Sequence, residues 1–317
     1  MKIKLVPAKT KVPFLQQRFI TFGISAVLIL LSAFMFFGPG LNKGIDFEGG
    51  IMIEAGFETA PDLGDMRSSL GGLGLGQISL QTFGAPDDIL IRVQRQDGDA
   101  EAQKNAVAKV KAQLVADNGA GISYRRIEFV GPTVSAELVD TAILAVLVSV
   151  LAILIYIWLR FEWHYSVGAI AALGHDVILT IGMFAITGIE FNIASIAAIL
   201  TIVGYSINDT VVVYDRIREN FRRYKKMDVK DLLDLSINET LSRTVMTSVT
   251  TLLALIALFV FGGEVIRGFA TAMIFGVVVG TYSSIFVAAP ILLQIGLTHH
   301  NEEDDGFKPS DDEAYDV

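Results

Sequence analysis

The sequence predicts a polytopic α-helical membrane protein with six transmembrane helices and one α+β domain between the first and the second helix. Hydrophobic residues make up 52% of the 317 residues, which is too many for an ordinary soluble domain. Six apolar stretches are each long enough to cross a hydrocarbon core of about 30 Å. Between the first two stretches lies a long region of mixed polarity, which predicts a folded domain outside the membrane.

The basic residues predict how the six spans are oriented. We place the spans at 17–37, 140–159, 165–188, 193–214, 244–262 and 268–296. An even number of spans puts both termini on one side of the membrane. Seven Lys or Arg residues lie within 216–230, and short cytoplasmic loops are rich in such residues. The sequence therefore predicts three cytoplasmic segments: the N-terminus 1–16, a basic loop with an amphipathic helix at 215–243, and an acidic tail at 297–317.

The region 38–139 has the pattern of a small α+β domain. Strands are predicted at 45–57, 77–83, 88–94 and 122–130, and helices at 62–70 and 101–116. The clearest strand signal is the alternation that puts Ile89, Ile91 and Val93 on one face. The resulting order, β-α-β-β-α-β, is the split βαβ arrangement of ferredoxin-like modules. Because long loops are translocated regardless of their charge, we expect this domain to be periplasmic.

Composition argues against several classes of function. A net charge of −9 makes nucleic acid an improbable partner, and the absence of cysteine excludes disulfides and thiolate chemistry. The glycines at 71, 72, 74 and 76 lack the Lys-Ser/Thr pair of a phosphate-binding loop, so we interpret them as a flexible turn. No catalytic, metal or cofactor site is indicated, and we expect a protein that is not an enzyme.

Three charged residues lie within or at the edge of the apolar spans. Asp209 is the single charge between 193 and 214, and a carboxylate near a helix centre costs about 2.5–3.5 kcal/mol to insert. Asp176 lies deeper, in the third span, and Arg243 stands at the start of the fifth. An intramembrane proton or ion site would explain the two carboxylates. Interfacial positions with snorkelling side chains remain the alternative for Asp209 and Arg243.

Several short motifs resemble the SecF family of the bacterial Sec translocation machinery, a half-length relative of the RND exporters. They occur in the family's order at 44–50 (GIDFEGG), 129–133 (FVGPT), 175–177 (HDV), 204–210 (GYSINDT), 215–220 (DRIREN) and 241–248 (LSRTVMTS). Besides the three charged residues, the motif positions that we single out are Asp46, Gly49, Gly50, Gly131, Pro132, Gly204, Asn208, Asp215 and Arg216.

The resemblance implies an auxiliary subunit of the Sec translocon in the bacterial inner membrane. Its obligate partner would be SecD, and the pair would use the proton or sodium motive force in late steps of protein export. SecYEG, YajC-like and YidC-like subunits, the bilayer and an unfolded translocating chain are the further partners implied. Asp209 would be the proton-relay carboxylate and Arg243 its basic partner, with a less defined role for Asp176.

Three other functions are compatible with parts of the sequence. One is half of an RND-type exporter of lipids or small molecules, although such proteins usually join two six-span repeats. Another is an intramembrane aspartyl protease, which would require Asp176 and Asp209 to share a proton. The last is a structural membrane subunit without ion coupling of its own, which should tolerate the loss of Asp209.

Overall fold

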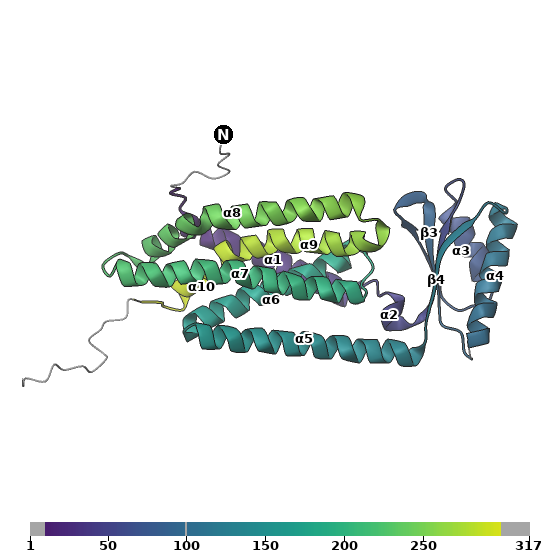
Figure 1. Cartoon of the computed structure of the whole chain (residues 1–317), viewed down its shortest axis with the longest axis horizontal. Helices are drawn as coiled ribbons and strands as arrows, with labels where there is room; N and C mark the ends of the chain where they lie inside the picture. Colours follow the sequence, from purple (N-terminus) through teal and green to yellow (C-terminus); the bar gives the residue numbers. More distant parts are fainter. Residues whose placement is uncertain (1–9, 99, 299–317) are drawn as a thin grey trace, which may run out of the picture.

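The long apolar helices form a bundle, and a four-stranded sheet lies at one end of it (Figure 1). This computed structural model describes residues 10–98 and 100–298. The predicted N-terminal segment 1–16 and the predicted acidic tail 297–317 therefore fall largely outside the described residues.

Six helical segments among the described residues are long and apolar enough to cross a membrane, which confirms the predicted number of spans. They are formed by η1 (Phe14–Gln17) with α1 (Arg18–Phe37), α5 (Pro132–Arg160), α6 (Trp163–Thr187), α7 (Ile193–Arg223), α8 (Val229–Phe261), and α9 (Glu264–Ser283) continued by η2 (Ser284–Ala288) and α10 (Ala289–Gln294). The windows of α6, α7 and α9 are the most buried, so these three helices form the centre of the bundle.

Three helices are longer than the predicted spans. α5 begins at Pro132, directly after the N-cap residue Gly131, and carries the chain without interruption from the sheet along the bundle (Figure 1). α7 continues past the predicted end at 214 to Arg223. The amphipathic helix predicted before the fifth span is the first part of α8, which is continuous from Val229 and contains neither Gly nor Pro to break it.

The last span is interrupted near its end by the π-helical turn η2. Pro290 follows this turn, and because proline lacks an N–H and crowds the preceding turn, it disturbs regular α-helical hydrogen bonding. In the same turn, the carbonyl of Ala288 accepts a hydrogen bond from the hydroxyl of Tyr214 in α7, at 3.1 Å. Ser284, the first residue of the turn, is hydrogen-bonded to the hydroxyl of Thr210 in α7 at 3.0 Å.

The sheet domain has the predicted order β-α-β-β-α-β. Its elements are β1 (Gly50–Gly56), α3 (Leu63–Gly71), β2 (Ile78–Phe83), β3 (Ala85–Val93), α4 (Ala100–Asn118) and β4 (Ser123–Val130). The strands lie in the order β2-β3-β1-β4, and every neighbouring pair is antiparallel. The strand predicted from residue 45 is wrong at its start, because the short helix α2 (Ile45–Glu48) precedes β1.

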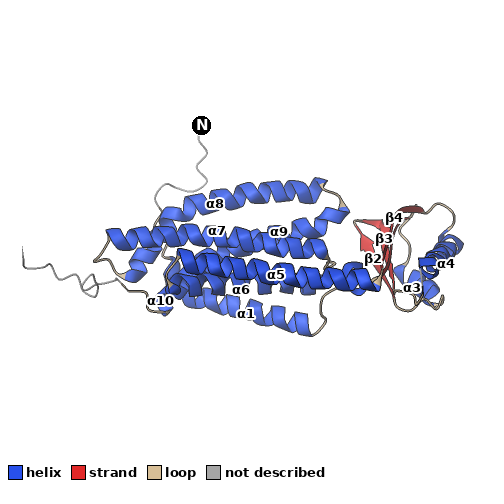
Figure 2. Cartoon of the chain, turned by 60° about the horizontal axis from the view of Figure 1, so that its bottom comes forward, coloured by secondary structure: helices blue, strands red, loops and turns tan. Residues whose placement is uncertain are grey.

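One face of the sheet is covered by α3 and α4, and the other faces the helix bundle (Figure 2). Ile89, Ile91 and Val93 point into the core under the two helices, as their alternation predicts. Val110 and Leu114 of α4 are fully buried against them. On the opposite face a smaller apolar cluster holds Ile45, Met52 and Leu90, so that α2 packs between the sheet and the bundle.

The first turn of α3 offers a test of the domain's local stability. The Asp62 carboxylate accepts hydrogen bonds from the N–H groups of Gly64 (2.7 Å) and Asp65 (3.1 Å). The hydrogen bonds from Asp65 and Gly64 hold the pKa of Asp62 below its ordinary value of 3.8. Because this pKa is lowered on folding, the ionised Asp62 carboxylate stabilises the folded domain. This contribution is complete above the unfolded-state pKa and is lost as pH falls through the folded-state pKa.

We expect Asp62→Ala to accelerate amide hydrogen exchange in α3 of the full-length chain, because the cap of the helix is lost. Asp62→Asn is the matched control, since Asn also caps helices but does not titrate. It should keep the protection at neutral pH and lose the dependence on pH below about 4. Unchanged exchange in the Ala variant would show that the cap does not hold the helix.

Candidate functional site

The segment before β1 requires glycine at two positions. Gly49 and Gly50 have φ of +69° and +125°, values that other residues rarely adopt. A Cβ on Gly50 would lie 2.7 Å from the carbonyl oxygen of Val93 in the neighbouring strand β3. The two glycines thus allow the chain to turn sharply from α2 into the middle of the sheet.

The same segment contacts the end of the bundle through Asp46. Its carboxylate accepts a hydrogen bond from the backbone N–H of Ile193, the first residue of α7, at 3.1 Å. Its carbonyl accepts another from the hydroxyl of Ser135 in α5, at 3.0 Å. A carboxylate at this place is also favoured by the partial positive charge of a helix N-terminus. Asp46 therefore links the sheet domain to two helices of the bundle.

A second contact joins β3 to the turn between α6 and α7. Arg92 pairs with Glu190 at 2.5 Å and donates to the side-chain oxygen of Asn42 at 2.7 Å. Asn42 in turn donates to the carbonyl of Gly188, which ends α6, at 2.7 Å. These side chains are partly or largely buried, so salt screens the attraction between Arg92 and Glu190 less than it screens a surface ion pair.

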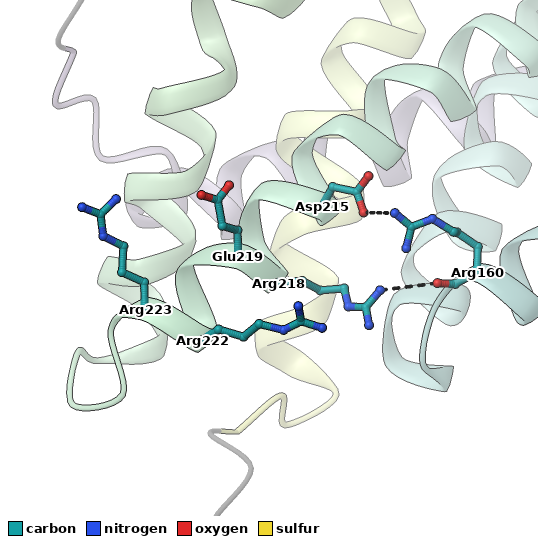
Figure 3. Close-up of a pocket in the computed structure, with 6 residues that line it drawn as sticks. All are labelled: Arg160, Asp215, Arg218, Glu219, Arg222 and Arg223. Carbon is teal, nitrogen blue, oxygen red and sulfur yellow. Dashed lines mark hydrogen bonds and ion pairs between the residues drawn. The ribbon is translucent and has the colours of Figure 1, made fainter.

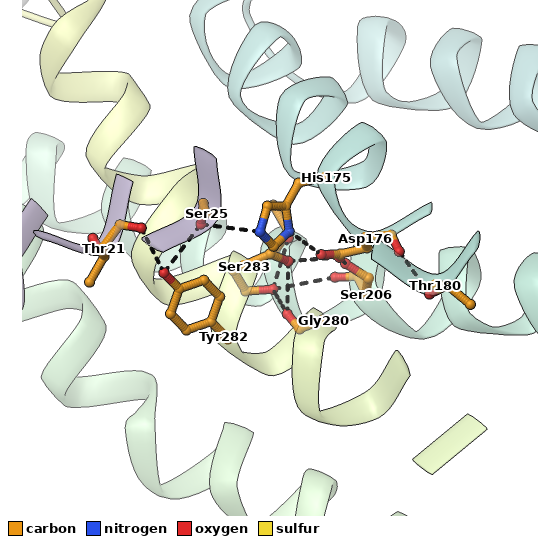
Figure 4. Close-up of polar contacts among 11 residues, drawn as sticks. Thr21, Ser25, His175, Asp176, Thr180, Ser206, Gly280, Tyr282 and Ser283 are labelled. Carbon is orange, nitrogen blue, oxygen red and sulfur yellow. Dashed lines mark hydrogen bonds and ion pairs between the residues drawn. The ribbon is translucent and has the colours of Figure 1, made fainter. Parts of the chain in front are cut away.

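Inside the bundle, Asp176 of α6 is the centre of a hydrogen-bonded cluster (Figure 4). The side chain is fully buried. Its Oδ2 accepts from the hydroxyls of Ser206 in α7 (2.5 Å) and Ser283 in α9 (2.7 Å), and its Oδ1 lies 2.8 Å from Nδ1 of His175. A buried carboxylate is tolerated when several donors surround it, and three helices supply the donors here.

The cluster extends from His175 toward α1. Nε2 of His175 lies 3.1 Å from the hydroxyl of Ser25, and that hydroxyl lies 3.2 Å from the phenol oxygen of Tyr282. Tyr282 donates to the carbonyl of Thr21 at 2.9 Å. A continuous row of polar atoms thus runs from Asp176 through the middle of the bundle to a backbone carbonyl of α1 (Figure 4).

Two arrangements of hydrogen atoms are compatible with this row of heavy atoms, although in the first one no hydrogen lies between Ser25 and Tyr282 while Tyr282 donates to Thr21. In the first, a neutral His175 donates from Nδ1 to Asp176 and accepts the proton of Ser25 at Nε2. In the second, His175 is protonated on both nitrogens, and Nε2 donates to Ser25, Ser25 to Tyr282 and Tyr282 to Thr21. The two arrangements use the same heavy-atom positions and differ by one proton.

Asp209 lies on the buried side of α7, one helical turn beyond Ser206. Its side chain is 2% exposed, and its Oδ2 has no hydrogen-bond partner among the described residues. Arg243 of α8, its predicted basic partner, is the opposite charge that acts on it, although the two side chains form no ion pair in the described part of the chain. Arg243 is exposed, and no acidic side chain in the described ranges lies within ion-pair distance of it. The hydroxyl of Thr244, the next residue of α8, is also buried without a partner.

Asp176 and Asp209 do not form a catalytic pair of carboxylates. Asp176 is level with Ser206, about 5 Å along α7 from Asp209, and both of its oxygens already accept hydrogen bonds from other residues. An aspartyl protease would need the two carboxylates to share one proton. The geometry therefore gives no support to proteolysis.

The remaining motif residues of α7 lie outside this cluster. Gly204 and Asn208 are exposed on the opposite side of the helix. Near the end of α7, Asp215 pairs with Arg160 of α5 at 2.6 Å, and Arg216 pairs with Glu239 of α8 at 2.7 Å. Asp215 and Arg216 therefore tie the ends of three helices together.

Two glycines of α9 bring it close to α7, as the Gly-x-x-x-Gly spacing predicts. A Cβ on Gly276 would lie 2.3 Å from the side chain of Ile202, and a Cβ on Gly280 would lie 3.1 Å from that of Ser206. This close packing positions Ser206 and Ser283 on the same carboxylate oxygen.

These observations define the class of the protein first. Six apolar helices with a buried row of ionisable and hydroxyl side chains, joined to an α+β domain, form a multi-pass membrane protein with a polar site inside its bundle. Residues 110–298 match the family described as protein export membrane protein SecD/SecF, C-terminal, and residues 34–61 match the SecD/SecF GG motif. The chain belongs to the SecD/SecF family.

Individual relatives agree with this assignment. The chain is 46% identical over 302 residues to the protein translocase subunit SecF of Rickettsia felis, covering 95% of this chain and 97% of that one. It is 47% identical to SecF of Rhodobacter capsulatus, covering 98% and 96%. The crystal structure of SecDF from Thermus, a translocon-associated membrane protein, matches with a TM-score of 0.81 and 36% identity. That match covers 93% of this chain and 40% of the larger SecDF chain.

We expect Gly276→Ala to lower the free energy of unfolding by about 1–3 kcal/mol, because the added methyl group overlaps Ile202 and forces α7 and α9 apart. The measurement is the thermal unfolding midpoint of the purified chain in detergent. Gly204→Ala is the matched control, since no atom lies within 4 Å of the position that its Cβ would occupy. Equal midpoints for the two variants would contradict the packing role of Gly276.

Proposed function

We propose that the chain is a SecF-type translocase subunit that couples proton movement through its bundle to late steps of protein export, without catalysing covalent chemistry. The family assignment and the SecF relatives of nearly equal length support the export role. The observation that carries the coupling is the buried row from Asp176 to Thr21, because it accommodates two hydrogen arrangements that differ by one proton. Asp209, one helical turn from Ser206, is a second titratable group in the same interior; it is buried, and its Oδ2 has no hydrogen-bond partner in the described part of the chain.

The partner in this proposal is a SecD-like chain. The chain corresponds to 40% of the Thermus SecDF chain, so in that protein much more polypeptide accompanies the matched part. Large apolar side chains of α1 and α5 are exposed here, for example Phe19, Leu147 and Leu151. Contact with lipid and with a second set of membrane helices would cover them. SecYEG, YajC-like and YidC-like subunits and an unfolded translocating polypeptide complete the proposed assembly.

The coupling needs a connection from the bundle to the sheet domain, and α7 supplies it. The helix carries Ser206 and Asp209 on its buried side, and its first residue, Ile193, donates to Asp46 in the segment that leads into β1. A shift of α7 along its axis would act directly on that segment. The neighbouring pair of Arg92 and Glu190 holds β3 to the turn that begins the same helix.

The proposed orientation puts the sheet domain in the periplasm and both termini in the cytoplasm of a bacterium, with the helices in the inner membrane. The ends of α5 and α7 that carry Arg160, Arg218 and Arg222 lie at the opposite end of the bundle from the sheet (Figures 1 and 3). The excess of arginine there supports a cytoplasmic position.

Cysteine labelling tests this orientation, since the chain has no cysteine of its own. We expect Asp97→Cys, at an exposed position of the sheet domain, to react with a membrane-impermeant thiol reagent in cells with a permeabilised outer membrane. Lys226→Cys, at an exposed position after α7, is the control and should react only after the inner membrane is opened. The reverse pattern would show that the orientation is inverted.

Two alternatives make different demands on the interior of the bundle. A structural subunit would need the buried polar row only for packing, and it should tolerate an isosteric change at Asp209. An exporter of lipids or small molecules would act without an exported polypeptide. We favour export of polypeptide because the matched family is one of protein-export proteins.

Replacing Asp209 by Asn is the decisive test of the coupling. The amide has the size of the carboxylic acid but cannot bind and release a proton. An ion that crosses 100 mV supplies about 2.3 kcal/mol per charge, and work is drawn from it only where a group along the path changes its charge. We expect Asp209→Asn to accumulate and to bind its SecD-like partner normally, while stimulation of export by the proton gradient is lost.

Asn208→Ala is the control for this experiment, because Asn208 is exposed on the same helix. It should leave both assembly and the response to the proton gradient unchanged. If Asp209→Asn assembles and export still responds fully, Asp209 is not the coupling group. Asp176→Asn would then distinguish proton coupling through the row centred on Asp176 from a purely structural role of the buried polar groups.

A further inference from the structure

The end of the bundle away from the sheet holds an open pocket of about 520 Å³ that neither the buried row nor the export role uses. It lies where α5 ends and α7 leaves the apolar span. Six residues line it: Arg160, Asp215, Arg218, Glu219, Arg222 and Arg223. Four arginines and two acids give this lining a net positive charge.

The acidic residues of the pocket are already engaged. Asp215 pairs with Arg160 at 2.6 Å, and Glu219 pairs with Arg216, outside the pocket, at 2.5 Å. Glu162 lies 3.9 Å from Arg218, but its side chain is largely exposed. Within the lining, Asp215 therefore neutralises Arg160, whereas Arg218 has only its long contact with Glu162 and Arg222 has no ion pair in the described part of the chain.

Three arginines lie on one side of the pocket, where the guanidinium group of Arg160 is directed at Asp215. Figure 3 shows Arg218 and Arg222 extended in the same direction, toward Arg160 at the end of α5, whereas Arg223 and Glu219 point away. Arg218 donates a long hydrogen bond of 3.5 Å to the carbonyl of Arg160. Arg222 forms no ion pair with an acidic side chain in the described part of the chain. A guanidinium group is planar and can donate two parallel hydrogen bonds, which matches the geometry of a phosphate group.

The surroundings of the pocket indicate where that phosphate comes from. Trp158 and Leu159, directly before Arg160, are 67% and 81% exposed, and Trp163 at the start of α6 is 52% exposed. Exposed tryptophans at the ends of transmembrane helices mark the level of the lipid headgroups. A lipid whose phosphate lies in the pocket could place its acyl chains along the exposed apolar side of α5. Basic pockets between transmembrane helices are known to hold anionic headgroups.

We propose that the pocket formed by Arg160, Arg218 and Arg222 binds the headgroup phosphate of an anionic phospholipid. The bound lipid bridges the ends of α5 and α7, which contact each other at this level through the pair of Arg160 and Asp215. Binding is independent of the proton-coupling function proposed above, because none of the buried groups of the bundle takes part.

The test is a titration of the purified full-length chain in uncharged detergent with phosphatidylglycerol, followed by native mass spectrometry. Phosphatidylcholine is the comparison lipid, since its phosphate is neutralised by its own headgroup. We expect phosphatidylglycerol to bind more tightly. Arg222→Gln should weaken that binding about fivefold, the effect of one basic residue on an anionic headgroup. Arg223→Gln, the adjacent arginine that points away, is the matched control and should change it less than about twofold.

Three results would overturn the proposal. Equal weakening by Arg222→Gln and Arg223→Gln would show that general positive charge, not this pocket, attracts the lipid. Equal affinity for phosphatidylcholine would show that the anionic headgroup is not recognised. Displacement of the lipid by millimolar inorganic phosphate, with the same dependence on Arg222, would identify a site for free phosphate instead.

Discussion

The arrangement of the bundle depends on the burial of the Asp176 carboxylate. An ionised carboxylate that loses its water is costly unless hydrogen-bond donors replace the water, and removing one partner from such a group is strongly destabilising. Here the donors come from α6, α7 and α9, and the row continues to α1. One carboxylate therefore sets the relative positions of these helices. The glycines of α9 allow the close approach of α7 and α9 that this arrangement requires. Apolar packing alone would allow more than one register of α7 against α9.

The polar row and the sheet domain are connected by backbone as well as by side chains. α7 begins at a hydrogen bond with Asp46 and passes Ser206 and Asp209 before it ends among the arginines. A helix is stiff along its axis, because its hydrogen bonds run in that direction. Displacement at one end is thus transmitted to the other end. This geometry makes α7 a mechanical path between the interior of the bundle and the segment that starts β1.

Much of this fold follows from the sequence, since it rests on local patterns. The six spans follow from hydropathy, and the order of strands and helices follows from periodicities such as that of Ile89, Ile91 and Val93. Asp209 and Asp176 stand out because charge is rare in apolar helices. The helix at Ile45–Glu48 was not predictable from its apolar residues, because tertiary contact of Ile45 with Met52 and Leu90 decides its conformation.

The partners of Asp176 could not be predicted, for a related reason. Ser25 and Tyr282 are far from it in the sequence, and hydroxyl residues in a span are also common where helices merely pack closely. Only the fold shows that His175 joins them to the carboxylate. The same limit applies to Arg243, whose position beside the fifth span predicts proximity to Asp209 but not whether the two side chains touch.

The absence of that contact is itself informative about the bundle. Oδ2 of Asp209 and the hydroxyl of Thr244 are buried polar groups without hydrogen-bond partners among the described residues, and they lie on the two neighbouring helices α7 and α8. Between the same helices and α9, Tyr205, Ser248 and Thr281 are joined by hydrogen bonds of 3.1 and 2.7 Å. An ionised Asp209 carries a desolvation cost that a closer Arg243 or entering water would reduce. A protonated Asp209 carries a much smaller desolvation cost, so it favours the present packing. The interface of α7 and α8 is therefore where a change in the charge of Asp209 alters the balance between two arrangements, one helical turn from the hydrogen-bonded row around Asp176.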